Sequence, residues 1–280
     1  MQRDQALIER WTGAAPFWEK HREAIRQMLE PVTSALIKDA GIARGDTVLD
    51  VATGPGEPAL GIAAAVGPEG RVAGVDPIPG MIATARRAAD RGGFRNAQFE
   101  IAFSDDLPFP EDHFDAVVSR FGIMFAPSPI DAVREMLRVL KPGRKLAFAV
   151  WHQPENNPFF YALSRVLDRY APSSPVDPDA PEGFRFAPPG KLRRILDAAG
   201  AVETSERAFT CKFEAPVSTE DFWELRVEMS EKLREKVERL SPEQRRLARQ
   251  QALAAIGEYA TPLGVTFPAA VLIVTGKKAG

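Results

Sequence analysis

The segment VLDVATGPGEPAL, residues 48–60, has the composition of a ligand-binding turn. An apolar run ends in Asp50, glycines follow at Gly54 and Gly56, and Pro58 stands where a helix can begin. Glycine adopts backbone angles that other residues resist and lets a ligand approach the main chain closely. In open α/β sheets, ligands bind in the crevice outside the carboxyl ends of the strands. We therefore expect the chemistry of this protein to centre on this turn.

These residues alone do not identify the ligand. Gly54, Gly56 and Ala59 also fit the dinucleotide-binding fingerprint, and Asp76 stands where that fingerprint places an acid for a ribose hydroxyl. A third interpretation is a tight structural turn that binds nothing. The combination of an acid, glycines, a helix and a second acid favours a ligand site, whereas the choice of cofactor needs more of the sequence.

The elements that must position these residues alternate between strands and helices from residue 47 onward. This alternation requires parallel crossovers and predicts a doubly wound α/β sheet. A helix is expected from Ser128-Pro129 to the stop signal Lys141-Pro142-Gly143. The other expected helices are Pro58–Val66 and Gly80–Arg91, and the expected strands are Thr47–Val51, Arg71–Val75, Ala97–Ala102, Phe114–Arg120 and Lys145–Trp151.

The flanking regions differ in pattern from this core. Residues 1–45 are predicted to form a helical cap that Pro31 divides in two. Residues 46–153 are predicted to form the cofactor-binding α/β core. Residues 154–258 are predicted to form a helical lid. Within this region, residues 172–190 are expected to be a loop, which contains six prolines, and residues 191–213 are expected to form a helix and a strand that belong to the core. An apolar stripe from Phe222 to Leu240 predicts one helix, and a second helix is expected to start at Ser241. The final strand is expected within residues 259–280.

The composition is that of an ordinary globular protein with a core. The formal net charge of −2 argues against a broad grip on nucleic acid, and one cysteine, Cys211, allows no internal disulfide or cysteine zinc cluster. Three scattered histidines are too few for a metal triad, so no metal is expected. We expect no signal peptide and no membrane span, because the apolar runs are far shorter than the about 18 residues a membrane helix needs. A cytoplasmic location follows as the default.

Further motifs complete the pattern. They are Val75-Asp76-Pro77 with Met81, Asp105-Asp106-Leu107-Pro108-Phe109, Phe114-Asp115-Ala116-Val117-Val118 and Arg138-Val139-Leu140-Lys141-Pro142-Gly143. In this order and spacing, residues 45–152 resemble the class I S-adenosylmethionine-dependent methyltransferases, most closely the small-molecule group with the ubiquinone and menaquinone C-methyltransferases. The resemblance implies a Rossmann-like, seven-stranded, mostly parallel sheet with its last strand antiparallel and a helical lid. It also implies a methyltransferase (a transferase) that uses S-adenosyl-L-methionine for small-molecule methylation.

The resemblance assigns residues to the cofactor. Asp76 matches the acid that accepts hydrogen bonds from both ribose hydroxyls. Ala52 stands where the family usually has glycine, and Phe103 where an aspartate commonly holds the adenine amino group. Either Ser104 and Asp105 supply that contact, or adenine is held by stacking and backbone. The full set implied for the cofactor is Asp50, Ala52, Thr53, Gly54, Gly56, Asp76, Pro77, Met81, Ser104, Asp105, Ser119 and Arg120.

Arg120 stands at the end of a strand that is expected to be buried. It could pin the cofactor carboxylate in bidentate geometry, or form an ion pair with Asp115 or Asp50.

Other residues are candidates for the acceptor side. His152 follows the fifth strand and could act as a general base for a hydroxyl acceptor, since histidine titrates near neutrality. An aromatic N-terminal helix could cap the site or only pack, because Trp11 and Trp18 share a helical face. The residues assigned to substrate and lid are Trp11, Phe17, Trp18, His21, Phe160 and Phe222.

The predicted function is methyl transfer to a small acceptor, apolar or aromatic. Two alternatives stay open: a nicotinamide-dependent oxidoreductase that uses the same glycines, and a non-catalytic protein that binds the cofactor. The sequence identifies neither the acceptor nor whether oxygen, carbon or nitrogen receives the methyl group. The sequence also does not decide whether the protein forms a homodimer.

Overall fold

The computed structural model of the chain describes residues 5–173 and 177–280. Residues 1–4 and 174–176, which belong to the expected cap and proline-rich loop, lie outside the described residues. The helices are α1 Gln5–Lys20, α2 Arg22–Ala40, α3 Ala59–Val66, α4 Pro79–Gly92, α5 Pro129–Val139, α6 Pro158–Asp168, α7 Lys191–Ala199, α8 Thr219–Met229, α9 Glu231–Arg239 and α10 Pro242–Gly257, with short 3-10 turns at Ile123–Phe125 and Pro154–Asn156. The strands are β1 Thr47–Val51, β2 Arg71–Asp76, β3 Ala97–Ile101, β4 Phe114–Arg120, β5 Leu140–Trp151, β6 Val202–Ala215, β7 Ala260–Thr261 and β8 Gly264–Lys277.

The sheet confirms the predicted fold class. Its order is β3-β2-β1-β4-β5-β8-β6, and the two-residue β7 pairs with β8 outside this path. The pairs among β1 to β5 are parallel, whereas β8 is antiparallel to both β5 and β6. The seven strands of the main path are thus parallel except for β8, as the resemblance implies.

The centre of the sheet lies at β1 and β4. Val48 and Leu49 of β1 are fully buried, as are Val117 and Val118 of β4, because helices cover both faces. β1 pairs with β2 on one side and with β4 on the other. The parallel register brings the carboxyl ends of these three strands to one edge, so the residues that follow them converge there.

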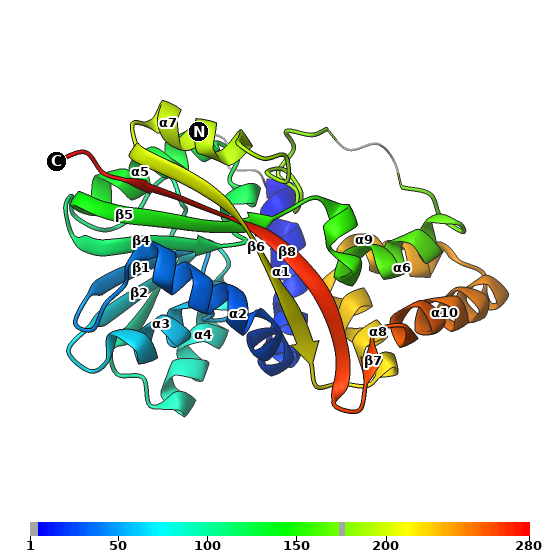
Figure 1. The fold of residues 1–280 in the computed structure, drawn as a ribbon. Helices are drawn as coiled ribbons and strands as arrows, with labels where there is room; N and C mark the ends of the chain where they lie inside the picture. Colours follow the sequence, from blue (N-terminus) through cyan, green and yellow to red (C-terminus); the bar gives the residue numbers. More distant parts are fainter. Residues whose placement is uncertain (1–4, 174–176) are drawn as a thin grey trace.

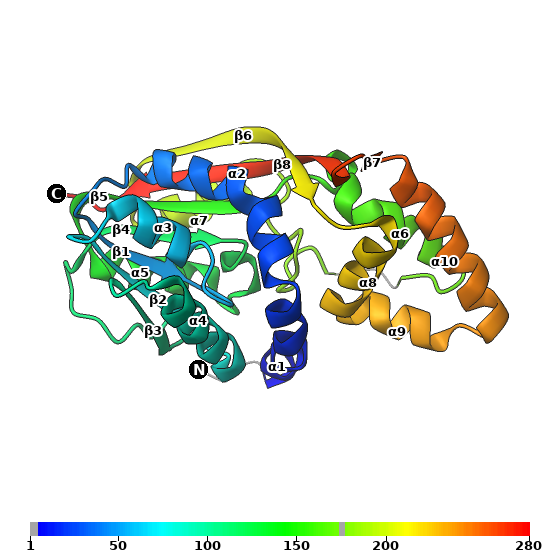
Figure 2. The ribbon, with the colours of Figure 1, turned by 90° about the horizontal axis from the view of Figure 1, so that it is seen from below.

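Helices form a layer on each face of the sheet (Figures 1 and 2). α3 and α4 contact β1 to β3, and α2 contacts β4, β5, β6 and β8. On the other face, α5 contacts β5, and α7 contacts β6 and β8. This arrangement leaves the carboxyl edge of the sheet free of core helices.

A second group of helices, α6, α8, α9 and α10, gathers beyond that edge, where the far ends of β6 and β8 extend to meet it (Figure 1). α1 lies between this group and the core (Figure 2). It contacts α4 of the core and α8 of the second group. None of the helices within the described ranges is long and apolar enough to cross a membrane.

The prediction that Pro31 divides the N-terminal helices is wrong. Pro31 lies inside α2, and the two helices meet at His21. A proline inside a helix costs about 3 kcal/mol. α2 tolerates it because its apolar face, which includes Met28, Val32 and Leu36, is buried against the sheet.

Two of the other expected helices also end at different residues than predicted. The stripe from Phe222 to Leu240 belongs to two helices, since Ser230 ends α8 and its hydroxyl accepts a hydrogen bond from the Leu233 N–H in the first turn of α9. α5 ends at Val139, before Lys141-Pro142-Gly143, because Leu140 already pairs with Phe114 in the sheet.

Candidate functional site

A cavity of ≈ 390 Å³ lies at the carboxyl edge of the sheet. It is bounded by the turns after β1, β2 and β4 on one side and by α1 on the other. Its lining residues include Leu7, Ile8, Trp11, Trp18, Ala52, Thr53, Gly54, Glu57, Asp76, Pro77, Ile78, Met81, Phe103, Ser104, Asp105, Asp106, Arg120, Phe121 and Phe125.

The turn after β1 holds three residues with positive φ. Ala52 has a φ of 58°, Gly54 of 56° and Gly56 of 101°. A Cβ on Gly54 would meet nothing within 4 Å, and Gly54 lines the cavity, so its backbone is open to a ligand. A Cβ on Gly56 would lie 3.2 Å from Ala85 of α4, so this glycine permits close packing instead. Ala52 keeps the left-handed conformation at the position where the family usually has glycine.

Asp76 stands at the end of β2, next to the glycine turn. Its Oδ2 accepts a hydrogen bond from the Gly54 N–H at 3.0 Å and its Oδ1 accepts one from the Ile78 N–H at 3.0 Å. Burial raises the pKa of Asp76 to about 6, against the opposing effect of these two hydrogen bonds. The carboxylate therefore faces the cavity from a fixed position, with lone pairs left for ligand hydroxyls.

Asp50 does not reach the cavity. It is fully buried, and its Oδ2 accepts a hydrogen bond from the Ala59 N–H at 3.1 Å, which fixes the start of α3. Its Oδ1 has no hydrogen-bond partner among the described residues. Burial raises the pKa of Asp50 to about 7 against the opposing influence of the Thr53 hydroxyl and the Arg120 charge.

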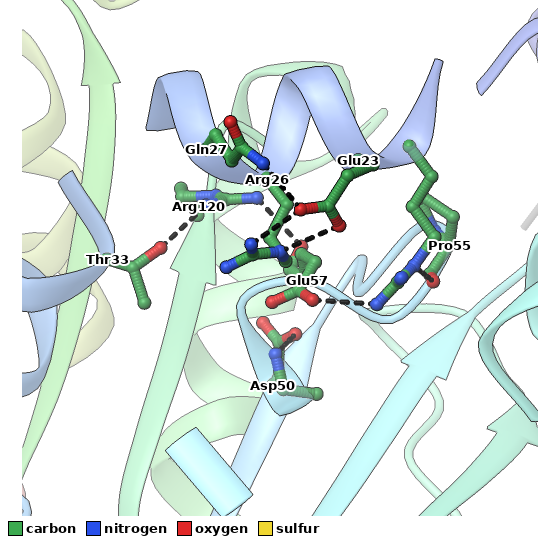
Figure 3. A network of polar contacts seen from close by, with 10 residues as sticks. Glu23, Arg26, Gln27, Thr33, Asp50, Pro55, Glu57 and Arg120 are labelled. Atoms are coloured by element: carbon green, nitrogen blue, oxygen red, sulfur yellow. Dashed lines mark hydrogen bonds and ion pairs between the residues drawn. The ribbon is translucent and has the colours of Figure 1, made fainter. Parts of the chain in front are cut away.

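Arg120 is a buried cation at the end of β4 (Figure 3). It donates hydrogen bonds to the Thr33 hydroxyl at 2.6 Å and to the Glu57 carbonyl oxygen at 3.1 Å. Burial lowers the pKa of Arg120, whereas the charges of Glu57 and Asp50 raise it. Asp115, the other expected partner, pairs with Lys141 and Arg144 instead.

Glu57 connects the glycine turn to the N-terminal helices. The Arg22 guanidinium donates to Glu57 Oε1 at 2.7 Å and to the Pro55 carbonyl oxygen at 3.1 Å. Arg22 opens α2, directly after α1, so this contact joins the helix that covers the cavity to the turn that lines it. Sequence reasoning missed Glu57, although it stands inside the GPGEP string.

The opposite wall follows β3. Phe103, Ser104, Asp105 and Asp106 all line the cavity, and Phe103 and Asp106 form an isolated β-bridge. Met81 in α4 lines it as well. An apolar side chain thus stands where the family commonly has an aspartate, with Ser104 and Asp105 beside it.

α1 supplies an aromatic wall. The Trp11 and Phe125 rings meet edge to face at 4.9 Å, and the Trp11 and Trp18 ring centroids lie 6.1 Å apart. All three line the cavity. The Trp18 Nε1 is buried without a hydrogen-bond partner among the described residues. The aromatic wall therefore contains one N–H group that does not donate a hydrogen bond to any described residue.

The other expected lid residues lie away from the cavity. Phe17 contacts Arg234, and His21 pairs with Glu228 at 2.6 Å. Phe222 and Phe160 belong to an aromatic cluster around Phe159.

The structure does not bring His152 to the cavity. It follows β5 and is partly buried outside the lining residues. Its Nδ1 lies 2.7 Å from the Gln153 N–H, which donates to it, and 2.9 Å from Asn156 Nδ2. In the neutral ring Nδ1 is therefore the acceptor and Nε2 carries the proton, which leaves no free lone pair for a base.

Most of the residues expected at the cofactor thus converge on one cavity. Those that line it are Ala52, Thr53, Gly54, Asp76, Pro77, Met81, Ser104, Asp105 and Arg120, with Trp11 and Trp18 from α1, whereas Asp50, Gly56 and Ser119 lie behind the lining. Sequence reasoning missed Phe121 and Phe125. Phe121 has a φ of 61°, a strained value for a bulky residue, and its position directly after a strand-end arginine was the available signal.

Residues 48–143 are similar in sequence to a known protein family and to curated relatives. Residues 48–143 match the model of the family described as a methyltransferase domain. The ubiquinone/menaquinone biosynthesis C-methyltransferase UbiE of Pseudomonas putida strain GB-1 is 38% identical over 136 residues, which cover 48% of this chain and 52% of that protein. UbiE of Ectopseudomonas mendocina is 40% identical over the same length. The chain spans about half the length of the curated relatives it matches.

Solved structures share the fold. The YcgJ protein from Bacillus subtilis has a TM-score of 0.56 at 19% identity, covering 89% of this chain and 98% of that one. A phosphoethanolamine N-methyltransferase 2 of Haemonchus contortus, solved with S-adenosyl-L-methionine, has a TM-score of 0.55 at 16% identity, covering 94% and 57%. Residues 48–143 of this chain are therefore a class I S-adenosylmethionine-dependent methyltransferase domain that resembles the domain of the ubiquinone/menaquinone C-methyltransferases.

Proposed function

We propose that the protein transfers a methyl group from S-adenosylmethionine to a small acceptor that is apolar or aromatic. The observation that carries the proposal is that the glycine turn and Asp76 line the same cavity as the aromatic residues of α1 and lie opposite them. One side of this cavity is polar and suits an adenosine group, and the other is apolar. A donor and an acceptor would then meet between β1 and α1.

The residues present fit the cofactor. Asp76 would accept hydrogen bonds from the ribose hydroxyls, since its carboxylate is fixed by two backbone donors. Gly54 would let the ribose and methionine portion approach the main chain, because a Cβ there has open space before it. Met81 and Phe103 would contact adenine, and Arg120 would contribute positive charge near the methionine carboxylate.

The bound cofactor supplies a methyl group that its sulfonium already activates. The work of the protein is then to align the acceptor with that methyl group and to exclude water. Trp11, Trp18 and Phe125 would form the apolar side of this arrangement. Alignment of this kind contributes up to about 7–11 kcal/mol to lowering a barrier. A strong carbon nucleophile needs no further base.

We also propose that α1 and the helices α6, α8, α9 and α10 of residues 154–258 act together as a lid over a core formed by residues 46–153, the helix and strand of residues 191–213 and the final strand in 259–280. Lys20 and His21 at the end of α1 bind Glu228 of α8, which supports a common movement. Arg22 would transmit that movement to the glycine turn through Glu57.

An acceptor screen tests the proposal. The protein would be incubated with S-adenosylmethionine and a panel of phenols, quinols, aromatic acids and amines, with release of S-adenosylhomocysteine as the readout. The mass of each product then shows where the methyl group went. Asp76→Asn serves as the matched variant. Release from a cognate acceptor that the variant loses supports the proposal, whereas binding of NAD in place of S-adenosylhomocysteine overturns it.

A further inference from the structure

Phe121 holds a strained backbone conformation at the cavity. It follows β4 directly and lines the cavity with a φ of 61°, a value that is uncommon for a bulky residue. Its N–H donates to the Ala149 carbonyl oxygen at 2.8 Å, so the pairing with β5 holds the residue in place. Residues in such conformations cost free energy and cluster at active sites and ligand-binding sites. The conformation of Phe121 therefore points to a role at the cavity.

The next residue, Gly122, joins Phe121 to the glycine turn. A Cβ on Gly122 would clash with the Ala52 side chain and lie 2.7 Å from the Ser119 Oγ. The backbone after Phe121 thus packs directly against the turn after β1. Ala52, Phe121 and Gly122 all line the cavity. Phe121 consequently stands beside the turn on which the cofactor is proposed to bind.

One face of the Phe121 ring is covered by Trp151, the last residue of β5. The two rings stack with their centroids 3.9 Å apart and their planes 5° from parallel. Phe121 lines the cavity and Trp151 does not, so Trp151 lies behind Phe121 as seen from the cavity. Phe121 is only partly buried, which agrees with a second face that no ring covers. The face that Trp151 leaves uncovered therefore borders the cavity.

Trp151 itself is held on several sides. It is buried, and the rings of Phe160 and Phe213 meet its ring edge to face at 4.6 and 5.8 Å. The Phe121 ring therefore rests on a support that cannot turn away without repacking the core. A ligand that uses a surface fixed in advance loses less conformational freedom on binding. Phe121 thus presents a rigid, flat, apolar surface to the cavity.

We propose that Phe121 is the positioning residue for the methyl acceptor, and that the acceptor is a planar aromatic ring which stacks on it. This inference rests on the proposed function and narrows its acceptor class from apolar or aromatic to planar aromatic. Two aromatic rings in contact gain more than the area they bury, whereas a saturated ring of the same size gains only from that area. Because Gly122 packs on Ala52, a ring stacked on Phe121 lies next to the methyl donor.

The test compares two neutral probes on the protein loaded with S-adenosylhomocysteine. Phenol is planar and aromatic, whereas cyclohexanol keeps the ring carbons and the hydroxyl group but has no flat face. Ligand-observed NMR titration should show that the wild-type protein binds phenol about threefold or more tightly, as expected for the contribution of an aromatic pair. Equal affinities, or tighter binding of cyclohexanol, would overturn the inference.

Three variants locate the preference. Phe121→Leu keeps an apolar side chain and removes the ring, so phenol and cyclohexanol should bind it equally. Phe121→Tyr keeps the flat face and should keep the preference. Phe209→Leu is the matched control, because Phe209 of β6 is also partly buried but lies outside the lining of the cavity. A preference that survives in Phe121→Leu, or disappears in Phe121→Tyr or in the control, contradicts the assignment.

The affinity for S-adenosylhomocysteine distinguishes this role from a purely structural one. Phe121→Leu should bind that ligand as the wild type does, because the ring is assigned to the acceptor and not to the cofactor. A loss of affinity for S-adenosylhomocysteine and for both probes alike would mean that Phe121 only supports the turn, and it would overturn the inference.

Thermal unfolding shows whether the variants are folded. If Phe121→Leu does not fold, Phe121→Asn takes its place, since asparagine adopts the left-handed conformation more readily than most residues and has no aromatic ring. This variant should also bind phenol and cyclohexanol equally. A preference for phenol that persists in Phe121→Asn contradicts the assignment.

The two proposals fail separately. Absence of S-adenosylhomocysteine binding to the wild type contradicts the proposed function. Normal binding of that ligand without a preference for phenol contradicts only the role of Phe121.

Discussion

The Asp76 carboxylate accepts a hydrogen bond of 3.0 Å from the backbone N–H of Gly54. This contact joins the end of β2 to the turn after β1, so the two sequence motifs form one surface. The Ile78 N–H holds the second carboxylate oxygen. A ligand that hydrogen-bonds to Asp76 therefore meets the glycine turn at the same time.

Removing this carboxylate should weaken binding without unfolding the protein. Asp76→Ala is expected to lose roughly 1.5–3 kcal/mol of affinity for S-adenosylhomocysteine, the range for a hydrogen bond to a charged group. Titration calorimetry measures the loss. Asp90→Ala, at an exposed position on α4, is the control and should bind as the wild type does. An unchanged affinity in Asp76→Ala would remove Asp76 from the site.

The affinity should also depend on pH. The pKa of Asp76 is raised to about 6 by burial, and the ionised carboxylate is the better acceptor for ligand hydroxyls. Binding of S-adenosylhomocysteine should therefore be strongest above pH 6 and weaken as the pH falls through that value. Asp76→Asn should lack this step. A wild-type profile as flat as that of the variant between pH 5 and 8 would contradict the assignment.

The two glycines should respond differently to a side chain. Gly54→Val places its Cβ in open space at the cavity, so it should abolish binding of S-adenosylhomocysteine, with a stability cost of about 1–2 kcal/mol for the left-handed backbone. Gly56→Val should destabilise the fold more, because its Cβ lies 3.2 Å from Ala85 and its φ is 101°. Urea unfolding and calorimetry distinguish the two. Wild-type binding by Gly54→Val would place the ligand elsewhere.

Asp50 should limit stability at high pH. Its pKa is raised from 3.8 to about 7, so the folded state favours the protonated form. The stability that this group contributes is fully present below pH 3.8 and is lost as the pH rises to 7. Asp50→Asn should thus be more stable than the wild type at pH 8, and the gain in urea unfolding should shrink toward pH 4. A variant less stable at pH 8 would show that Asp50 is needed as a carboxylate.

His152 should have little effect on turnover. Its Nδ1 already accepts a hydrogen bond from the Gln153 N–H, and the residue lies outside the lining of the cavity. His152→Ala is expected to keep at least half of the wild-type rate with any acceptor found in the screen. A loss of about 10²–10⁴, the usual contribution of a general base, would restore His152 as that base.

Local pattern was sufficient to predict the core. The strand Phe114–Arg120 matches β4 residue for residue, and the end of β1 at Val51 and the φ values of Gly54 and Gly56 follow from the motif itself. These features depend on neighbours in the chain, which the sequence contains directly.

Features that depend on distant contacts were not predictable in the same way. Pro31 remains in α2 because the sheet buries that helix, and Ser230 separates α8 from α9 within one continuous apolar stripe. The burial of Arg226 in α8 is of the same kind, because it depends on α6, whose Phe159 ring lies 4.2 Å from the guanidinium.

The central claim is that the cavity at the carboxyl edge holds S-adenosylmethionine, and one calorimetric comparison tests it most directly. S-adenosylhomocysteine and NAD would each be titrated into the wild-type protein and into Asp76→Ala under the same conditions. The account predicts saturable, one-to-one binding of S-adenosylhomocysteine that Asp76→Ala weakens, and no binding of NAD. One-to-one binding of NAD without binding of S-adenosylhomocysteine would contradict it.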